Sequence, residues 1–205
     1  MRKLLNLLHN FHWIVPCEAA RSAQSYLGLL GRFLTANGIK ALINLRGRHP
    51  KFGWWKYETR VCARNGVVHI DAMMDSRRLP LRDMLIALFD AFDAAPKPFV
   101  IKCSGGQDRT SLAAALYLVH RDGWAAMDEA LRQFARFPYL HFPRNQQRWL
   151  RDFLRYAKSE ENGLPLGEWV RRSYDPEKLA LWLNENGMSS HFNGIWEPWK
   201  PPATK

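Results

Sequence analysis

One short segment near the middle of the chain carries residues that could do nucleophilic chemistry on a phosphate group. It consists of Cys103, Ser104, Gly105, Gly106, Gln107, Asp108, Arg109 and Thr110. A cysteine thiolate is a strong nucleophile, and a planar guanidinium can hold two oxygens of a phosphate. The spacing of cysteine and arginine, with five residues between them, also occurs by chance, so the intervening residues and the fold must support this interpretation.

The composition of the segment favours an anion site. Gly105 and Gly106 let the backbone curl closely around a ligand, and successive N–H groups in such a loop form a nest for anions. The N-terminus of a following helix adds partial positive charge. The same field favours a thiolate at Cys103, and the Thr110 hydroxyl can donate to the sulfur. We therefore predict that Cys103 is the nucleophile and that residues 104–110 bind the phosphate.

The elements on either side of the segment place it at a sheet edge. Residues 99–103 form an apolar, β-branched run typical of a buried strand, and residues 111–119 are small or apolar, as in a helix packed against a sheet. A loop between a strand end and a helix start is where open α/β sheets bind ligands.

Further periodic segments surround this unit. Strands are predicted at 11–15, 41–45 and 67–70, and helices at 27–34, 54–64, 81–95, 124–134 and 149–158. Such alternation is typical of an α/β domain with a central, mostly parallel sheet of four to five strands. We predict this domain over residues 1–158. Residues 159–205, with one amphipathic piece around 176–186, are predicted to form a C-terminal helical extension that packs on it.

The overall composition limits the function classes. The 205 residues are 47% hydrophobic and 24% charged, which excludes disordered and collagen-like chains, and the net charge of +11 should attract anions. Phosphates and acidic lipid headgroups fit this charge, whereas nucleic acid is disfavoured because no binding motif is present. Three cysteines indicate a reducing, cytoplasmic location. No apolar run is long enough to cross a bilayer, and the leucine-rich N-terminus is interrupted by polar residues, which disfavours export.

The residues resemble the protein tyrosine phosphatase superfamily, in particular its small bacterial and fungal dual-specificity-like members. The resemblance covers about residues 10–155 and includes the stretches at 21–24, 38–46 and 65–68 besides the cysteine segment. Asp108, directly before Arg109, is also similar to the loop of myotubularin-type and related phosphoinositide phosphatases. Lys102 departs from the pattern, since the family usually has histidine there.

The resemblance implies transfer of a phosphoryl group to the cysteine and then to water, with an aspartate as general acid. The family places this acid on a loop some 27 to 32 residues before the cysteine, which fits both Asp75 and Asp71. We favour Asp75 because it lies between a strand end and the next helix, where a loop could close over the phosphate. Asp108 is the third candidate, as in the myotubularin-like pattern.

Three functions remain open from the sequence. The first is a phosphatase of protein phosphotyrosine with dual specificity. The second, supported by Asp108, Lys102 and the net charge, is a phosphoinositide or inositol phosphate phosphatase. The third is an adaptor that binds phosphate without turnover. None of them needs a metal or a cofactor, and the scattered histidines, His69 and His141 among them, show no metal-ligand spacing.

Two surface features could serve recognition. Arginines recur at spacings of four, three and four, which predicts one helix face. This face is either simply solvated or a contact for acidic lipid headgroups or a phosphopeptide. They are Arg144, Arg148, Arg151 and Arg155. The C-terminal tryptophans are expected to cover the domain; they are Trp169, Trp182, Trp196 and Trp199.

Overall fold

A five-stranded sheet lies at the centre of the computed structural model, which describes residues 2–26 and 28–198. The strand order is β1-β2-β5-β3-β4. The strands are β1 (His12–Val15), β2 (Ala19–Ser22), β3 (Ala41–Asn44), β4 (Val68–Asp71) and β5 (Phe99–Lys102). β2, β5, β3 and β4 run parallel, and only β1 is antiparallel to its neighbour. The prediction of a mostly parallel sheet in a single α/β domain is confirmed.

The second strand has no counterpart among the strands predicted from periodicity. β2 reads Ala-Ala-Arg-Ser and is buried at all four positions between β1 and β5. Two alanines and an arginine carry no β-branched or aromatic signal, so the pairing with β5 decides this strand rather than its own propensity.

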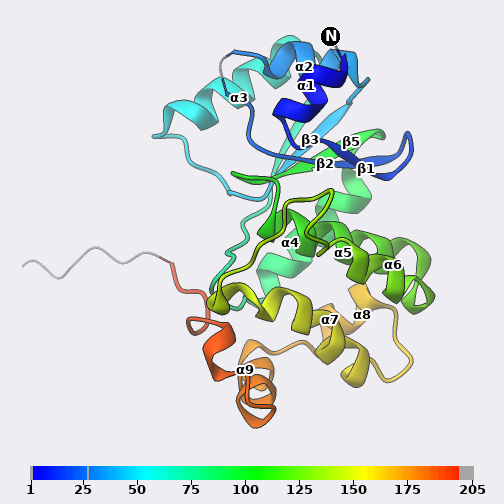
Figure 1. The fold of residues 1–205 in the computed structure, drawn as a ribbon, viewed down its shortest axis with the longest axis vertical. Helices are drawn as coiled ribbons and strands as arrows, with labels where there is room; N and C mark the ends of the chain where they lie inside the picture. Colours follow the sequence, from blue (N-terminus) through cyan, green and yellow to red (C-terminus); the bar gives the residue numbers. More distant parts are fainter. Residues whose placement is uncertain (1, 27, 199–205) are drawn as a thin grey trace, which may run out of the picture.

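Helices cover both faces of the sheet (Figure 1). One side carries α1 (Arg2–Leu8), α2 (Leu30–Ala36) and α3 (Gly53–Arg64). The other side carries α4 (Arg82–Ala94), α5 (Asp108–Asp122), α6 (Met127–Arg132), α7 (Trp149–Glu160), α8 (Leu166–Arg172) and α9 (Pro176–Glu185). Short 3-10 turns are η1 (Trp124–Ala126), η2 (Asn145–Gln147) and η3 (Ser189–His191).

The hydrophobic clusters on the two faces of the sheet differ in size. The side chains of Val100 and Leu42 belong to a small cluster under α2 and α3, whereas Phe99 and Ile101 belong to a large cluster under α4, α5 and α7. α5 lies in the large cluster and is buried at every position from 110 to 119. It contacts β2 and β5 of the sheet on one side and α7 on another, which fixes its position relative to the sheet.

The C-terminal segment contributes to the large cluster. Trp169 and Tyr174 are 1% and 0% exposed, and the Tyr174 hydroxyl donates to the carbonyl oxygen of Pro80 at 2.8 Å. α9 agrees with the predicted amphipathic piece, while α8 was not predicted. A domain boundary near residue 158 stays a prediction. Trp182 and Trp196 are half-buried, and Trp199 lies outside the described residues, as does Leu27, where the predicted helix 27–34 begins.

Two other helix predictions need correction. The helix predicted over 124–134 is a 3-10 turn followed by the short α6. The four spaced arginines do not share one helix, because Arg144 precedes η2 and Arg148 occupies the N-cap position of α7. In the part of the chain that the structure describes, no helix is both long and apolar enough to cross a membrane.

Candidate active site

The 103–110 loop connects β5 to α5, as the sequence predicts. Its sharpest constraint is at Gly106, where φ is +66° and a Cβ atom would lie 2.6 Å from the Ala23 nitrogen and 2.7 Å from the Ser22 carbonyl carbon. Both the left-handed backbone and the contact with the end of β2 therefore require glycine. Gly105 meets neither condition, since the nearest atom to its Cβ would be a Gln107 side-chain carbon at 3.5 Å.

Hydrogen-bond donors behind the loop fix the direction of its carbonyl groups. The Ser104 carbonyl accepts from the Gln24 backbone N–H at 3.1 Å. The carbonyls of Gly105 and Gly106 accept from Asn10 Nδ2 at 3.4 and 3.3 Å. In a trans peptide the N–H points opposite to the carbonyl of the preceding residue. With these carbonyls turned outward, successive N–H groups turn into the loop and form an anion nest.

Arg21 on β2 is the main anchor of this arrangement. Its Nη2 donates to the Gly106 carbonyl at 3.1 Å, to Ser111 Oγ at 2.8 Å and more weakly to the Gln107 carbonyl at 3.4 Å. Its Nη1 donates to the backbone and side-chain oxygens of Gln133 at 2.9 and 3.0 Å. The guanidinium is 0% exposed, and burial lowers its pKa to about 10, so it stays protonated at neutral pH.

The Cys103 thiol lies at the base of the loop and is 3% exposed. Burial would raise its pKa, but the Arg109 charge, the Thr110 hydroxyl and the N–H groups of Gln107 and Thr110 outweigh burial, and the pKa is lowered. Thr110 Oγ1 is buried and makes no hydrogen bond of normal geometry to the described residues. Its effect on the sulfur is therefore that of a nearby hydroxyl dipole. The loop favours a thiolate.

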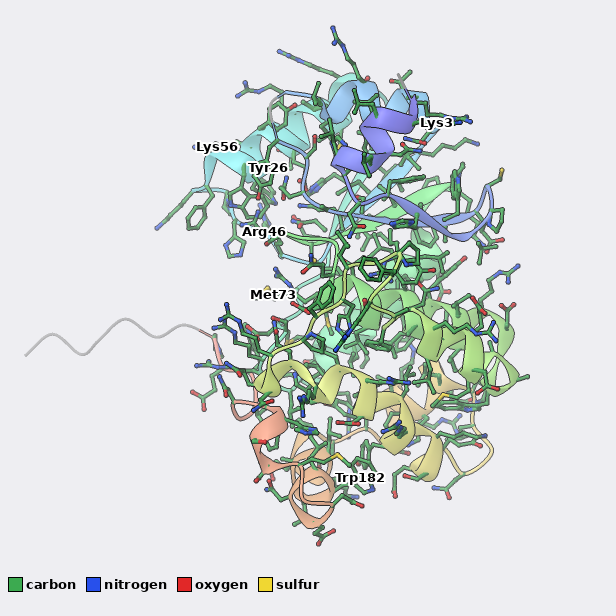
Figure 2. The ribbon with its side chains drawn as sticks, viewed as in Figure 1. Lys3, Tyr26, Arg46, Lys56, Met73 and Trp182 are labelled. Carbon is green, nitrogen blue, oxygen red and sulfur yellow. The ribbon has the colours of Figure 1, made fainter. Side chains whose placement is uncertain are left out.

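Two arginines bring charge to the mouth of the loop. Arg109 Nη2 donates to Ser104 Oγ at 3.1 Å, which folds the guanidinium back over the loop. Arg46, after β3, lies 3.7 Å above the Trp54 ring and donates to Gln24 Oε1 at 3.1 Å. Burial lowers the pKa of Arg46, and Arg109 and Cys103 are among the charges that act on it. Figure 2 shows Arg46 between Tyr26 and Met73 on one side of the molecule.

No family model and no curated protein matches the chain by sequence. Solved structures do match. TpbA from P. aeruginosa has a TM-score of 0.52 at 18% identity, with 87% of this chain and 92% of that chain covered. A mutant form of Tk-PTP gives 0.54 at 16% identity, covering 73% and 96%. The core catalytic domain of the PP-IP phosphatase SIW14 from S. cerevisiae gives 0.50 at 17%, covering 87% and 93%.

The chain has the protein tyrosine phosphatase fold. The match confirms the resemblance found in the sequence at the level of the fold.

In this protein tyrosine phosphatase fold, Lys102 is part of a buried ionic network. Its Nζ lies 2.7 Å from Glu58 Oε2 and donates to Gln24 Oε1 at 2.7 Å. Burial lowers the pKa of Lys102 to about 8, while Glu58 opposes this effect. Glu58 also accepts from His69 Nε2 at 2.9 Å, and these partners hold its pKa low despite burial. Lys102 thus points away from the thiol, into the α3 side of the sheet.

Asp71 is held in the same region by neutral donors. Its Oδ1 accepts from Asn44 Nδ2 at 2.7 Å, and both its oxygens accept from Trp55 Nε1, at 3.1 and 3.0 Å. The same bonds tie Trp55 to the end of β4. Asp71 is therefore the least available of the three candidate acids.

Asp75 caps a turn at the surface. Its Oδ1 accepts from the backbone N–H groups of Arg77 and Arg78 at 2.7 and 3.0 Å, whereas its Oδ2 makes no hydrogen bond to a described residue. The turn is tied to the 103–110 loop by Gln147, whose Nε2 donates to Ser76 Oγ at 3.2 Å and to Asp108 Oδ2 at 2.9 Å. One oxygen of Asp75 thus remains free beside a segment connected to the loop.

Asp108 begins α5 and faces a buried histidine. His141 is 4% exposed, its Nδ1 donates to the Phe134 carbonyl at 3.2 Å, and its Nε2 lies 3.5 Å from Asp108 Oδ1. Burial raises the pKa of Asp108 and lowers that of His141. Burial therefore favours the protonated form of Asp108, the form that a general acid needs.

The sequence did not single out Arg21, Arg46 or His141 for the site. Arg21 and Arg46 occur in stretches that resemble the family, and that resemblance was the available signal for both. His141 lies outside any motif, and only the folded chain brings it to Asp108.

Proposed function

We propose that this chain is a cysteine-dependent phosphatase that hydrolyses phosphomonoesters through a cysteinyl-phosphate intermediate. The observation that carries the proposal is the joint geometry of the 103–110 loop: its carbonyls are held outward, and the sulfur with the lowered pKa lies beneath its N–H groups. Such a loop stabilises a thiolate and a phosphate dianion with the same dipoles, which remain in place as charge moves between them.

The reaction proceeds in two steps. The Cys103 thiolate attacks phosphorus, the bond from phosphorus to the ester oxygen breaks, and a general acid gives its proton to the leaving oxygen. A water molecule then attacks phosphorus and loses a proton to the same carboxylate, and the S–P bond breaks to restore the thiolate. Arg109 binds two phosphate oxygens with its planar guanidinium throughout. No step needs a metal, so we expect chelators to leave turnover unchanged.

Asp75 is our first candidate for the acid because its free oxygen lies on a loop that could move over the phosphate. Asp108 is the second, favoured by its raised pKa and by its place next to Arg109. Variants of each carboxylate distinguish the two candidates.

The pH profile separates the two acids. Turnover needs Cys103 ionised, so activity falls as pH drops through the lowered thiol pKa, and it needs the acid protonated, so activity falls as pH rises through the acid's pKa. We expect Asp75→Asn to remove the alkaline limb and lower kcat by about 10²- to 10⁴-fold, while Asp108→Asn leaves that limb in place. The opposite pattern assigns the acid to Asp108. Steady-state kinetics with p-nitrophenyl phosphate and phenyl phosphate measure this, since the poorer leaving group depends more on the acid.

For the substrate, we propose phosphotyrosine in proteins first, with dual specificity for phosphoserine or phosphothreonine. The second candidate is a phosphoinositide or inositol phosphate, favoured by the charge that Arg46 and Arg109 place at the mouth of the loop. A peripheral contact with an acidic membrane would accompany that second substrate.

Phosphate release from a panel of substrates tests the proposal. The panel holds a phosphotyrosine peptide, a phosphoserine peptide and several phosphoinositides, each with wild type and Cys103→Ser. We expect release that disappears in Cys103→Ser, with the best substrate deciding between protein and lipid. Binding of these ligands without release from any of them would instead identify an adaptor. Cys62→Ser is the matched control, because that thiol is buried in the small cluster.

A further inference from the structure

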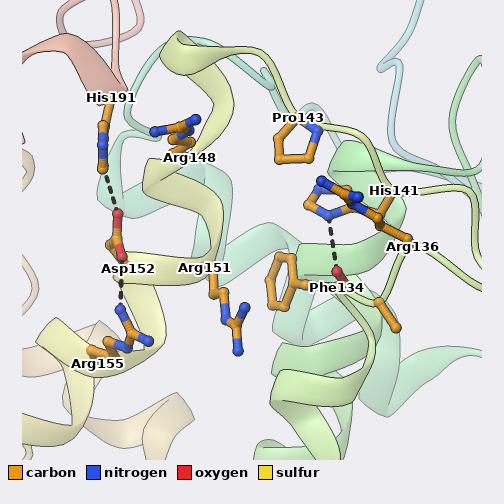
Figure 3. A pocket seen from close by; sticks show the side chains of 10 residues that line it. Phe134, Arg136, His141, Pro143, Arg148, Arg151, Asp152, Arg155 and His191 are labelled. Atoms are coloured by element: carbon orange, nitrogen blue, oxygen red, sulfur yellow. Dashed lines mark hydrogen bonds and ion pairs between the residues drawn. The ribbon is translucent and has the colours of Figure 1, made fainter.

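A cavity of about 490 Å³ opens beside α7, away from the 103–110 loop. Its wall carries four guanidinium groups and one carboxylate (Figure 3). We call it the arginine pocket; the residues that define it are Arg136, Arg148, Arg151, Asp152, Arg155 and His191, with Phe134, Ala135, His141 and Pro143. Its volume lies in the range of about 300 to 1,000 Å³ that is typical of small-molecule sites.

The single carboxylate of the pocket is already neutralised from within. Asp152 Oδ2 accepts from His191 Nδ1 at 2.9 Å, and its Oδ1 lies 3.3 Å from Arg155 Nη1. Arg148 and Arg151 form no ion pair with any described residue, and neither does Arg136 across the cavity. Three guanidinium groups thus line one cavity, and none of them has a carboxylate partner among the described residues. Like charges in a concave site repel each other and concentrate field lines, which draws anions from solution.

The helix pattern explains why these side chains gather. Trp149 and Phe153 pack into the large cluster at 0% exposure and fix the rotation of α7. Arg148, Arg151 and Arg155 then follow at spacings of three and four on the outer side, where they face the cavity. Arg144 belongs to the same run of the sequence but precedes η2 and does not line the cavity.

We propose that the arginine pocket is a second anion site, built for the phosphate groups of a multiply phosphorylated small molecule. Arginine holds phosphate oxygens in pairs, and the three unpaired guanidinium groups come from both sides of the cavity. A ligand with several phosphates can occupy more of these guanidinium groups in pairwise contacts than a single phosphate can. None of residues 103–110 lines the pocket, so the site is separate from the loop. Its wall reaches the loop through His141, whose Nε2 faces Asp108.

Calorimetric titration of the full chain with inorganic tripolyphosphate tests this inference. Because the 103–110 loop can also bind this probe, the titration is repeated in Arg109→Ala. We expect pocket binding to persist in Arg109→Ala. In Arg148→Gln/Arg151→Gln the dissociation constant of that site should rise at least about tenfold, as expected for the loss of charge-assisted hydrogen bonds to phosphate.

Arg144→Gln is the matched control, since it removes an exposed arginine of the same run that does not line the pocket. We expect its dissociation constant to stay within about twofold of wild type, because it makes no pocket contact. An equal loss in Arg144→Gln, or no loss in the double variant, would overturn the proposal. So would complete loss of binding in Arg109→Ala.

Two further measurements keep the result interpretable. The double variant should keep its thermal midpoint and its turnover of p-nitrophenyl phosphate, which shows that the fold and the loop are intact. Binding is measured without turnover, so a failure of the proposed catalysis does not affect the outcome.

A second experiment uses vesicles of phosphatidylcholine with phosphatidylinositol bisphosphate. Binding to these vesicles without binding of free tripolyphosphate would contradict a small-molecule site.

Discussion

The 103–110 loop and the arginine pocket both attract anions, but they do so by different means. The loop uses backbone N–H groups whose directions are set by buried partners, among them Arg21 at 0% exposure. The pocket uses the ends of Arg136, Arg148 and Arg151, which are exposed and unpaired within the described chain. The loop is therefore fixed before a ligand arrives, whereas the pocket must order long side chains when it binds.

This difference suits the loop to catalysis and the pocket to binding. A reaction centre gains most from dipoles that need no rearrangement as charge develops. A binding site can use flexible arginines, because their charge acts over a distance and their cost in side-chain entropy is met once, on binding. Changes to the loop should therefore affect turnover strongly, and changes to the pocket should affect affinity.

Gly106→Ala should give the largest effect. The added methyl group would lie 2.6 Å from the Ala23 nitrogen, and the φ of +66° disfavours alanine. The loop must shift, and several of its N–H groups then no longer point at the phosphate. Since one such donor contributes about 10²- to 10³-fold to turnover, we expect kcat to fall by at least about 10³-fold. Gly105→Ala is the matched control and should keep most of its activity. Comparable kinetics in both variants would contradict a preorganised loop.

Arg21 gives the next effect. Arg21→Met removes a buried cation and leaves Gln133, Ser111 and two loop carbonyls without their donor. A buried acceptor left without a donor costs about 1 to 3 kcal/mol, so the free energy of unfolding should fall by at least that amount, as measured by urea denaturation. Arg21→Lys keeps the charge but lacks the planar guanidinium that donates from two nitrogens. This variant should therefore fold and still lose turnover. If Arg21→Lys retained wild-type kcat, Arg21 would not orient the loop.

The smallest effect is expected from salt. Raising ionic strength from about 0.1 to about 1 M shortens the screening length from about 10 to about 3 Å. The exposed pocket should lose tripolyphosphate affinity several-fold, whereas KM for p-nitrophenyl phosphate at the buried loop should change less. Titrations and kinetics at matched salt concentrations measure both. An equal response at the two sites would remove the distinction between them.

The sequence predicted the parts of this molecule that have local signals. Cys103, Arg109 and the glycines lie together in one segment. An apolar run precedes this segment and a small, apolar stretch follows it, so the strand, the loop and the helix could be located. β2 and the role of Arg21 could not, because Arg21 donates to Gln133, which lies 112 residues away. Long-range polar contacts leave no periodic pattern.

The charged residues show the same limit. Lys102 looked like a departure from the family pattern next to the thiol. Its partner Glu58 is on helix α3, and only the fold brings the two together. The spacing of the arginines predicted a helical face. It could not show that Arg144 precedes the helix, or that the other three line a cavity together with Arg136.

The central claim is that Cys103 accepts the phosphoryl group, and trapping the intermediate tests it most directly. Wild-type protein turning over p-nitrophenyl phosphate is quenched in acid, digested and examined by mass spectrometry, with Cys103→Ser treated in parallel. We predict one phosphoryl group on the peptide that contains Cys103, and none on the peptides of Cys17 and Cys62. Continued phosphate release by Cys103→Ser, or turnover in wild type with no phosphoryl group on Cys103, would contradict the account.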